Sequence, residues 1–327
     1  MGIALYGEDG FFATGPVRSS EMGDFLTSPE VSPWFGRIVG RCVAAAVAGM
    51  ERPHLIEVGA GTGSLLASLL ESTDAQVEAW AVEASPMARE ALRSILGKER
   101  VTASLDEVPQ GQSGVILANE LIDNLPVSLA VRRGDGWDEH LVVTDGESFD
   151  YVSAPARPQV AAWAEDFGGA VPEGGIVEVQ LAAGEWLLQA MGMIERGSII
   201  LIDYGGTIEE LEPRRRLGTM RTYRGHHLGP DPLLEPGQTD ITVDVNFSAL
   251  EALARASGAR VTLQRQDDFL TSWGLRDVVS DLRHRELEAA RQADTMTQLV
   301  IRTDRIAAET LLHPRGLGDF RVLTIQV

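Results

Sequence analysis

Hydrophobic residues in the middle of the chain form short continuous runs that alternate with stretches of helical spacing. The segment "HLIEVGAGTGSLLASLLE" has the pattern of a strand, a glycine turn and a helix, and "QVEAWAVEASPMAREALRSIL" repeats it. Further apolar runs occur at "RVTAS", "GVILAN" and "GSIILIDYG". Continuous apolar runs are typical of parallel strands buried on both faces, with helices as the crossovers. The pattern predicts an α/β fold with a doubly wound, mainly parallel sheet.

The pattern changes on both sides of this core. Residues 33–50 have apolar positions at helical spacing, whereas the residues before them are rich in Gly, Ser and aromatics without a period. The stretch "SLAVRRGDGWDEHLVVT" predicts a hairpin within residues 128–150, inserted on the edge of the sheet. Beyond a long polar loop at 207–240, the pattern predicts a helix near 246–257, a strand at "RVTLQ", one or two helices at 278–312, and a closing antiparallel strand "FRVLTIQV".

The glycine turn "EVGAGTG" carries the first candidate chemistry. Glu57 ends the strand, and Gly59, Gly61 and Gly63 follow it, which leaves the backbone open to a ligand. A dinucleotide fingerprint places its third glycine three positions after the second, but Gly63 follows Gly61 by two. The spacing therefore favours S-adenosylmethionine over NAD. Glu83 ends the second strand, where a carboxylate can accept both ribose hydroxyls in either kind of site.

Polar residues follow the next two strands at the same edge. Ser104 and Leu105 come after the third strand, where we expect them to lie over the adenine. In "GVILANELIDNLPV", the fourth strand ends at Asn119 and is followed by Glu120 and Asp123. The carboxyl ends of strands in doubly wound sheets border the ligand crevice. The sequence therefore predicts that both carboxylates face the pocket.

Charge and cysteine content restrict the partners. Asp and Glu outnumber Lys and Arg by 48 to 28, a formal net charge of -20, which opposes nucleic-acid binding and attracts basic protein segments. The single cysteine, Cys42, cannot form an internal disulfide, which suits a reducing compartment. The chain contains neither a run of roughly 20 apolar residues nor a signal-peptide pattern. We therefore expect a cytosolic protein that does not bind a membrane.

Several motifs together resemble the MidA family of class I methyltransferases. They are "YGEDGFFATG", "GDFLTSPEVSPWFG", "EVGAGTGSLL", "ANELIDNLPV", "IDYGG" and "GTMRTYRGHHLGPDPLLEPGQTDITVDVNFSAL". The resemblance implies a class I methyltransferase fold, S-adenosylmethionine as cofactor, and activity on a protein arginine. It assigns the three glycines to the amino acid end of the donor, Glu83 to its ribose, and Asn119, Glu120 and Asp123 to the site. Thr27 and Ser28, with Pro29 and Glu30, match the segment that closes over the pocket.

The chain departs from the family pattern in one motif. Where the family commonly has Thr-Ala-His-Val-Asp-Phe, this sequence reads "TVDVNF", so that Asp244 replaces a histidine and Asn246 an aspartate. If the histidine shapes the substrate site, this change affects which substrate is bound.

The sequence leaves three interpretations of the function open, two of which differ in the group that accepts the methyl. A protein arginine would be held by Glu120 and Asp123, because paired carboxylates match the guanidinium fork. A small-molecule hydroxyl would require a general base, for which His226 and His227 are the candidates. In the third, the protein is a non-catalytic assembly factor that binds the donor. The pattern around the two histidines does not favour a metal site, and a homodimer is left open.

These features predict one elaborated domain of 1–327. Residues 1–50 would form an N-terminal cover and helix, and 51–206 the donor-binding core with the hairpin insertion at 128–150. Residues 207–327 would supply a substrate loop and the C-terminal helices and strands.

Overall fold

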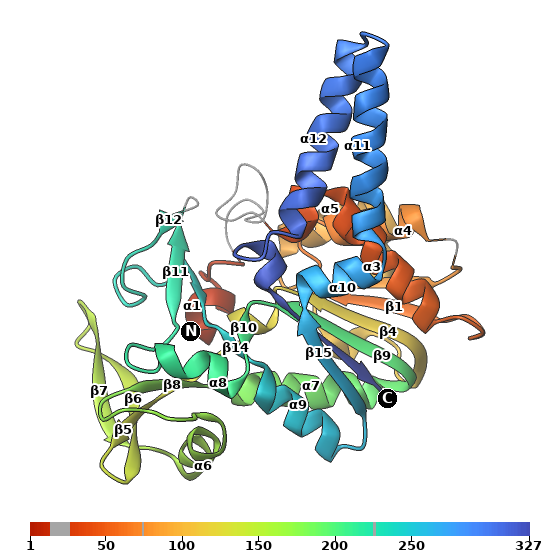
Figure 1. The fold of residues 1–327 in the computed structure, drawn as a ribbon. Coiled ribbons are helices and arrows are strands. Elements are labelled where there is room, and N and C mark those ends of the chain that lie inside the picture. Colours follow the sequence, from red (N-terminus) through yellow and green to blue (C-terminus); the bar gives the residue numbers. More distant parts are fainter. Residues whose placement is uncertain (14–26, 74, 225–226) are drawn as a thin grey trace.

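A twisted seven-stranded sheet lies at the centre of the molecule (Figure 1). The structure is a computed structural model that describes residues 1–13, 27–73, 75–224 and 227–327. The strands follow one another across the sheet as β15 (Arg260–Arg265), β16 (Arg321–Gln326), β9 (Ile194–Asp203), β4 (Gln112–Asn119), β1 (His54–Val58), β2 (Glu78–Val82) and β3 (Val101–Thr102).

The closing strand is the one antiparallel member of this sheet. Strand β16 pairs antiparallel with both β9 and β15, whereas the pairs among β9, β4, β1, β2 and β3 are all parallel. The predicted doubly wound α/β fold is confirmed, and so is the antiparallel insertion of "FRVLTIQV" near the sheet's end.

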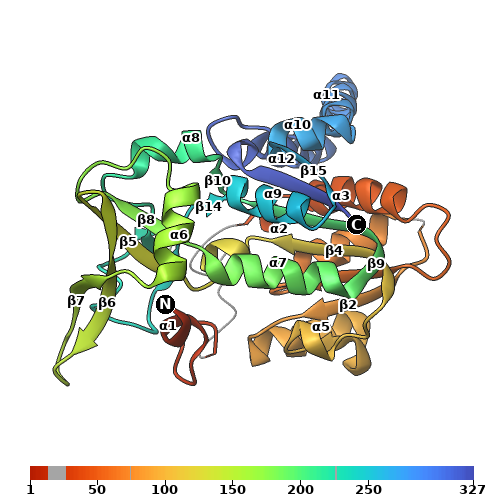
Figure 2. The same cartoon turned by 90° about the horizontal axis from the view of Figure 1, so that it is seen from below.

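Helices cover both faces of the sheet. One face packs against α3 (Pro33–Ala46), α4 (Ser64–Ser72), α5 (Pro86–Leu96) and α10 (Gln266–Ser272). The other face packs against α7 (Leu181–Met193) and α9 (Phe247–Ala256), which lie side by side in Figure 2. Successive residues of β4 serve the two layers in turn: Val115 and Leu117 join the first cluster and Ile116 the second. This explains why the strand reads as an unbroken apolar run.

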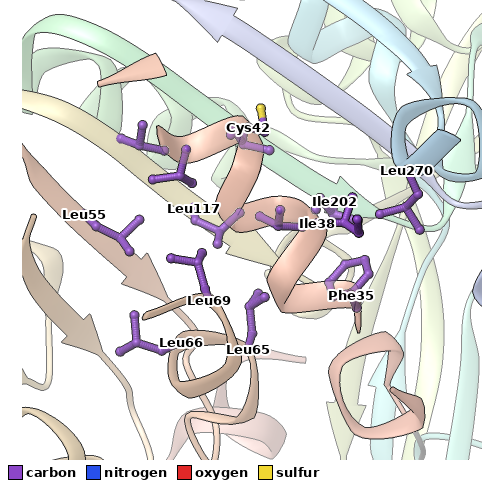
Figure 3. Close-up of a cluster of buried hydrophobic side chains, with 14 of the residues drawn as sticks. Phe35, Ile38, Cys42, Leu55, Leu65, Leu66, Leu69, Leu117, Ile202 and Leu270 are labelled. Atoms are coloured by element: carbon purple, nitrogen blue, oxygen red, sulfur yellow. The ribbon is translucent and has the colours of Figure 1, made fainter. Parts of the chain in front are cut away.

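The larger core cluster lies between α3, α4 and the sheet (Figure 3). Phe35 and Ile38 of α3 are fully buried against Leu65 and Leu69 of α4. Gly36 allows this close approach, because a Cβ atom there would lie 2.9 Å from the carbonyl oxygen of Leu65. Each buried side chain of this size contributes about 1.5–3 kcal/mol to folding. Helix α3 is thereby fixed against α4, the helix that begins directly after the glycine turn.

The insertion after β4 is larger than predicted. It is a separate antiparallel sheet with the order β7 (Phe149–Pro155), β6 (Gly136–Thr144), β5 (Ser128–Arg133) and β8 (Ile176–Val179), covered by α6 (Pro158–Phe167). The predicted hairpin is β5 and β6, but it does not extend the edge of the central sheet. Strand β8 returns to pair with β5, and a small core that includes Ala130 and Val177 closes the unit. This long-range pairing has no signal in the local pattern.

The predicted polar loop at 207–240 contains regular structure. It includes α8 (Ile208–Leu211), and its β11 (Arg221–Arg224) pairs with β12 (His227–Leu228) and β13 (Asp240–Thr242). Two short strands, β10 (Gly205–Gly206) and β14 (Val245–Asn246), pair in parallel and connect this region to the end of β9.

The predicted C-terminal helices form an antiparallel hairpin of α11 (Leu275–Arg291) and α12 (Thr295–Leu311), which projects from the body in Figure 1. The predicted helix at 33–50 ends earlier, at Ala46. In the described part of the chain, none of the helices combines the length and the apolar character needed to cross a bilayer.

Candidate active site

A cavity of about 300 Å³ opens at the carboxyl ends of β1, β2 and β4, as expected for a doubly wound sheet. Its lining includes Gly59 and Gly61 of the glycine turn, Glu83 after β2, and Asn119 and Glu120 at the end of β4. Its volume is at the lower end of the range for small-molecule sites, roughly 300–1,000 Å³.

The glycine turn needs its glycines for two different reasons. Gly59 (φ +72°), Gly61 (φ +50°) and Gly63 (φ +83°) all have left-handed backbones, which side chains disfavour. Gly59 and Gly61 line the cavity, but Gly63 does not. A Cβ atom on Gly63 would lie 2.6 Å from Ile95 and 2.8 Å from Leu92, so this glycine allows α4 and α5 to pack. The structure thus places two of the three predicted glycines at the cavity, and their role in donor binding stays a prediction.

Glu83 is fixed at the cavity wall by backbone donors. Its Oε2 accepts the N–H of Gly61 at 2.8 Å, and its Oε1 accepts the N–H of Ser85 at 2.7 Å. Burial raises the pKa of this carboxyl, and the two hydrogen bonds oppose the shift. Each oxygen keeps a further lone pair, so Glu83 could accept a diol.

Glu57 is a buried acid in the same wall. Within the described structure its Oε2 has no hydrogen-bond partner, and burial together with the charge of Glu83 raises its pKa to about 8. A buried polar atom without a partner is rare in folded proteins. A ligand with a cationic or N–H group would satisfy it.

Asn119 and Glu120 stand where β4 turns away from the sheet. Glu120 has φ +52°, an unusual value for a residue other than glycine, and its N–H donates to the carbonyl oxygen of Ile202 at 2.8 Å. Asn119 donates from Nδ2 to Glu120 Oε1 at 3.2 Å. Burial, and next the charge of Asp123, raises the pKa of Glu120 to about 8. Strained backbone of this kind clusters at functional sites.

Asp123 does not occupy the predicted position. It lies in the 3-10 turn η3 (Ile122–Asn124), is 4% exposed and is not among the described residues that line the cavity. Its Oδ2 accepts the hydroxyl of Tyr204 and, at 2.7 Å, that of Thr242. The prediction that Glu120 and Asp123 share one pocket-facing surface is therefore corrected: the tight turn directs Asp123 toward β13.

Asp203, at the end of β9, secures this turn. Its Oδ2 accepts the backbone N–H groups of Ile122 at 3.0 Å and Asp123 at 3.2 Å, and its Oδ1 accepts that of Tyr204 at 2.9 Å. Because the carboxylate is 1% exposed, these bonds hold the backbone that follows Glu120 in one arrangement.

The N-terminal segment forms the opposite wall. Thr27, Pro29 and Glu30 line the cavity, and Glu30 Oε2 accepts the N–H of Thr27 at 3.3 Å in a capping box of the short helix α2 (Ser28–Val31). Ser28 does not line it. The Ser28 backbone hydrogen-bonds with Glu120, and its Oγ accepts Nε2 of Gln266 at 3.2 Å. This segment therefore contacts the end of β4 directly.

Of the two predicted histidines, His227 alone belongs to the described part of the chain. His227 is exposed on β12 and is not part of the cavity, and His226 lies outside the described residues. The carboxylate of Asp244, the residue in place of the customary histidine, forms ion pairs with Arg214 and, at 2.7 Å, with Arg221. Asn246 caps α9 through the N–H of Ala249 at 3.3 Å. Among the residues that the structure describes, no cluster is suited to a metal ion.

Ser104 and Leu105 line the cavity, their place over the adenine stays a prediction, and other lining residues were missed. The missed ones include Tyr6, Phe12, Asn124, Leu125, Trp186 and Gln189. Trp186 and Gln189 belong to α7, whose apolar pattern reads as ordinary core. Tyr6 and Phe12, whose ring centroids lie 5.5 Å apart, stand in the quoted motif "YGEDGFFATG". Asn124 and Leu125 stand in the quoted motif "ANELIDNLPV", so these two motifs were the available signals.

Comparison with known proteins decides the family. Residues 38–264 match the model of a family of S-adenosyl-L-methionine-dependent methyltransferases. The chain belongs to this family. A Burkholderia thailandensis protein described as a COG1565 superfamily member and likely methyl transferase, solved with S-adenosylhomocysteine, is 30% identical with a TM-score of 0.86, and the match covers 100% of this chain and 86% of that one.

Curated relatives carry a more specific name. The mitochondrial protein arginine methyltransferase NDUFAF7 of Mus musculus is 28% identical over 91% of this chain and 73% of its own length. The Drosophila melanogaster homologue is 30% identical over 76% of this chain and 64% of its own length. The predicted resemblance to the MidA family is confirmed. The chain is a methyltransferase that uses S-adenosylmethionine.

The prediction of a cytosolic location is wrong on these findings, because the curated relatives are named as mitochondrial proteins. The low cysteine content indicated only a reducing environment, and it cannot distinguish the cytosol from another reducing compartment.

Proposed function

We propose that this methyltransferase transfers the methyl group to an arginine guanidinium of a protein partner. The observation that carries the proposal is the charge of the cavity. Its carboxylates are Glu30, Glu57, Glu83 and Glu120, and no Lys, Arg or His belongs to the lining in the described part of the chain. The charge of Glu120, whose carboxyl is desolvated at the end of β4, would be poorly compensated beside a neutral acceptor, at a cost of a few kcal/mol.

The donor side of the cavity would be formed by the segments after β1, β2 and β3. Gly59 and Gly61 would expose the backbone to the amino acid end of the donor, and Glu83 would accept the ribose hydroxyls. Ser104 and Leu105 would border the adenine. Asn119, with a buried Oδ1 that has no hydrogen-bond partner among the described residues, would complete this side. The donor itself supplies an electrophilic methyl group on a sulfonium.

The acceptor side would be formed by Glu120, Glu30 and the rings of Tyr6 and Phe12. A guanidinium presents its N–H donors in a planar fork that matches carboxylates and stacks on aromatic faces. Glu120 would orient one nitrogen in line with the methyl group, which is the main contribution a protein makes to such a displacement. Methylation of a guanidinium releases one proton, and a carboxylate whose pKa is about 8 is well suited to accept it.

The names of the curated relatives support this acceptor. A hydroxyl acceptor would require a nearby general base, and His227 is exposed outside the cavity. Glu120 is therefore the proposed catalytic residue, which orients the guanidinium and accepts its proton.

The test is methyl transfer from labelled donor into size-fractionated lysate of the source organism. We expect label on a large protein, recovered as methylarginine after hydrolysis, and loss of this label with Glu120→Gln. Glu195→Gln, which removes an exposed carboxylate before the central part of β9, is the matched control and keeps the activity.

Two outcomes would contradict the proposal. Label confined to small molecules and insensitive to Glu120→Gln would indicate a hydroxyl or another nucleophile as acceptor. Donor binding without any transfer would indicate an assembly factor.

A further inference from the structure

One face of α12 carries a continuous row of uncharged residues whose helical spacing puts them opposite the buried Ile301 and Ala308. We call this row the outer stripe; its members are Met296, Leu299, Val300, Thr303, Ile306, Ala307 and Thr310. Met296 is 73% exposed, Val300 65%, Leu299 51% and Ile306 48%. Large apolar side chains gathered in this way on a charged protein mark an interaction surface.

The outer stripe has the spacing of a coiled-coil seam. Met296, Thr303 and Thr310 are seven residues apart, and Leu299 and Ile306 recur at the intermediate position. The opposite side of α12 already packs on the body and on α11 through Ile301, Ala308 and Leu311. The helix therefore has two seams, and within the described residues the buried contacts are on one of them.

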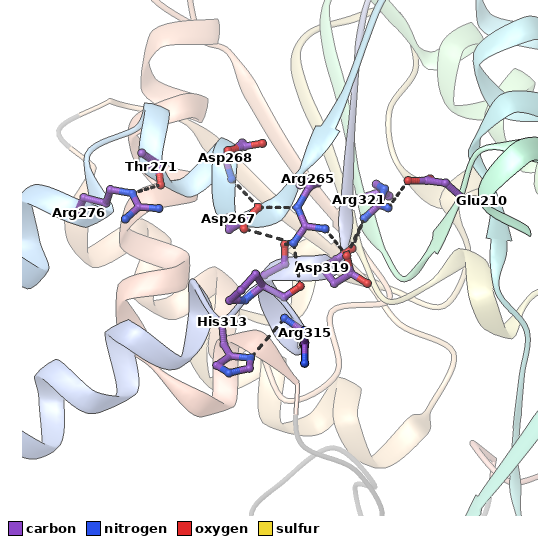
Figure 4. A network of polar contacts seen from close by, with 12 residues as sticks. Glu210, Arg265, Asp267, Asp268, Thr271, Arg276, His313, Arg315, Asp319 and Arg321 are labelled. Carbon is purple, nitrogen blue, oxygen red and sulfur yellow. Dashed lines mark hydrogen bonds and ion pairs between the residues drawn. The ribbon is translucent and has the colours of Figure 1, made fainter.

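The hairpin presents the outer stripe on a fixed support. Arg305 joins the two helices by binding Glu286 at 2.8 Å and Glu309 at 2.6 Å. Near the base, Trp34 Nε1 donates to Asp304 at 2.9 Å. Beyond the end of α12, Arg265 donates to the carbonyl oxygen of Pro314 at 3.0 Å within the network of Figure 4.

Charge on the hairpin differs from charge on the rest of the chain. Residues 275–312 contain six arginines and seven acidic residues, a net charge of -1, whereas the whole chain carries -20. Outside the hairpin the chain is strongly acidic, so these parts of two copies repel each other when they come close. The screening length at physiological salt is about 8 Å. A helix of 17 residues spans about 25 Å. The near-neutral hairpin is thus the place where two copies can meet with their bodies several screening lengths apart.

We propose that the outer stripe is a self-association surface, on which α12 packs antiparallel against α12 of a second copy. A two-fold axis at Thr303 sets Val300 opposite Ile306, and Leu299 opposite Ala307, so that large side chains meet apolar or small ones. The same axis sends the two bodies to opposite ends of the paired hairpins. A single helix pair buries less than a standard interface of about 1,600 Å², so the dimer is weak and concentration-dependent.

The chemistry of the outer stripe selects a second copy over the basic protein substrate. A basic partner would be drawn to carboxylates, and the outer stripe has none. Self-pairing places uncharged residues on uncharged residues and leaves the ion pairs of Arg283, Arg285 and Arg305 in place.

A cysteine at the proposed axis tests the contact directly. Thr303→Cys adds one accessible thiol to a chain whose only cysteine, Cys42, is buried. We expect mild oxidation at about 50 μM protein to give a covalent dimer on a non-reducing gel. His284→Cys is the matched control: this side chain is 67% exposed on α11, and it lies on the side away from the buried Leu282.

A charge in the outer stripe tests the same contact without a covalent bond. Val300→Glu should convert the wild-type dimer into monomer in sedimentation at about 50 μM, while donor binding and the thermal unfolding midpoint stay unchanged. Equal crosslinking of both cysteine variants would overturn the proposal. So would a monomeric wild type at this concentration, a dimer unaffected by Val300→Glu, or capture of a different protein by the outer stripe in place of a second copy.

Discussion

The donor side and the acceptor side of the cavity are built in different ways. The donor side comes from consecutive strand-turn-helix units, in which the backbone N–H of Gly61 donates to the carboxylate of Glu83 at 2.8 Å. The acceptor side brings together Tyr6, Glu30 and Glu120, which are far apart in the sequence. The first is determined by local geometry, and the second depends on long-range packing. Variants on the donor side should therefore abolish cofactor binding, whereas those on the acceptor side should change the chemical step.

The largest effect is expected for Gly61→Val. A β-branched side chain disfavours φ +50° and would project toward the proposed donor, so the Kd for S-adenosylmethionine should rise by at least about 100-fold. Calorimetry measures the affinity, and circular dichroism reports whether the sheet is intact. Gly97→Val is the matched control, because this glycine also has a positive φ, +82°, but its Cβ position is open. Equal losses of affinity in the two variants would show that strain, not the cavity, is responsible.

The same contrast explains what could be predicted from the sequence. The central sheet, the glycine turn and Glu83 follow from apolar runs and residue spacing, because each βαβ unit is determined over a few dozen neighbouring residues. Asp123 was misplaced because its direction depends on a single turn held by Asp203, some 80 residues further on. Trp186 was missed because an aromatic residue on a helix reads as core until the cavity beside it is known. The four-stranded insertion was underestimated because β8 pairs with β5 across α6.

Glu120→Gln should have the next largest effect. The amide keeps the volume but loses the charge that would hold a guanidinium, so kcat should fall by roughly 10²–10³-fold. The Kd for S-adenosylhomocysteine should change little, because Glu120 lies on the acceptor side. Single-turnover methyl transfer and calorimetry separate the two quantities. A large loss of affinity for S-adenosylhomocysteine with an unchanged kcat would show that Glu120 belongs to the donor side.

Donor affinity should also depend on pH. Glu57 and Glu120 both have a pKa of about 8, so they are mostly protonated at pH 6 and mostly ionised at pH 9. The sulfonium donor carries one positive charge more than its demethylated product, and ionised carboxylates favour it. The ratio of the two affinities should therefore rise by roughly 10-fold from pH 6 to pH 9. Calorimetry at both pH values measures it, and the shared amino acid group of the two ligands cancels. A ratio that does not change with pH would show that these acids do not sense the sulfonium.

An effect of similar size is expected for Asp203→Asn. This carboxylate accepts three backbone N–H groups, and an amide cannot serve all of them with its one oxygen. The turn after Glu120 should loosen, so kcat should fall by roughly 10-fold while KM for the donor stays constant. A role limited to stability would lower the unfolding midpoint and leave kcat unchanged. Rescue is not expected from Asp203→Glu, because the longer side chain does not fit the same three donors.

The smallest effect is expected for Asp123→Asn, and this variant sharpens the comparison within the acceptor side. Asp123 accepts the hydroxyls of Tyr204 and Thr242 on the far side of the η3 turn, and an amide oxygen can keep at least one of these bonds. Because this side chain does not line the cavity, kcat should stay within about 5-fold of the wild type, and the donor Kd within about 2-fold. Glu120→Gln, three residues earlier, is the internal reference under the same assay. If Asp123→Asn lowers kcat as much as Glu120→Gln does, Asp123 must reach the acceptor during the reaction. The paired-carboxylate arrangement predicted from the sequence would then form only when substrate is bound.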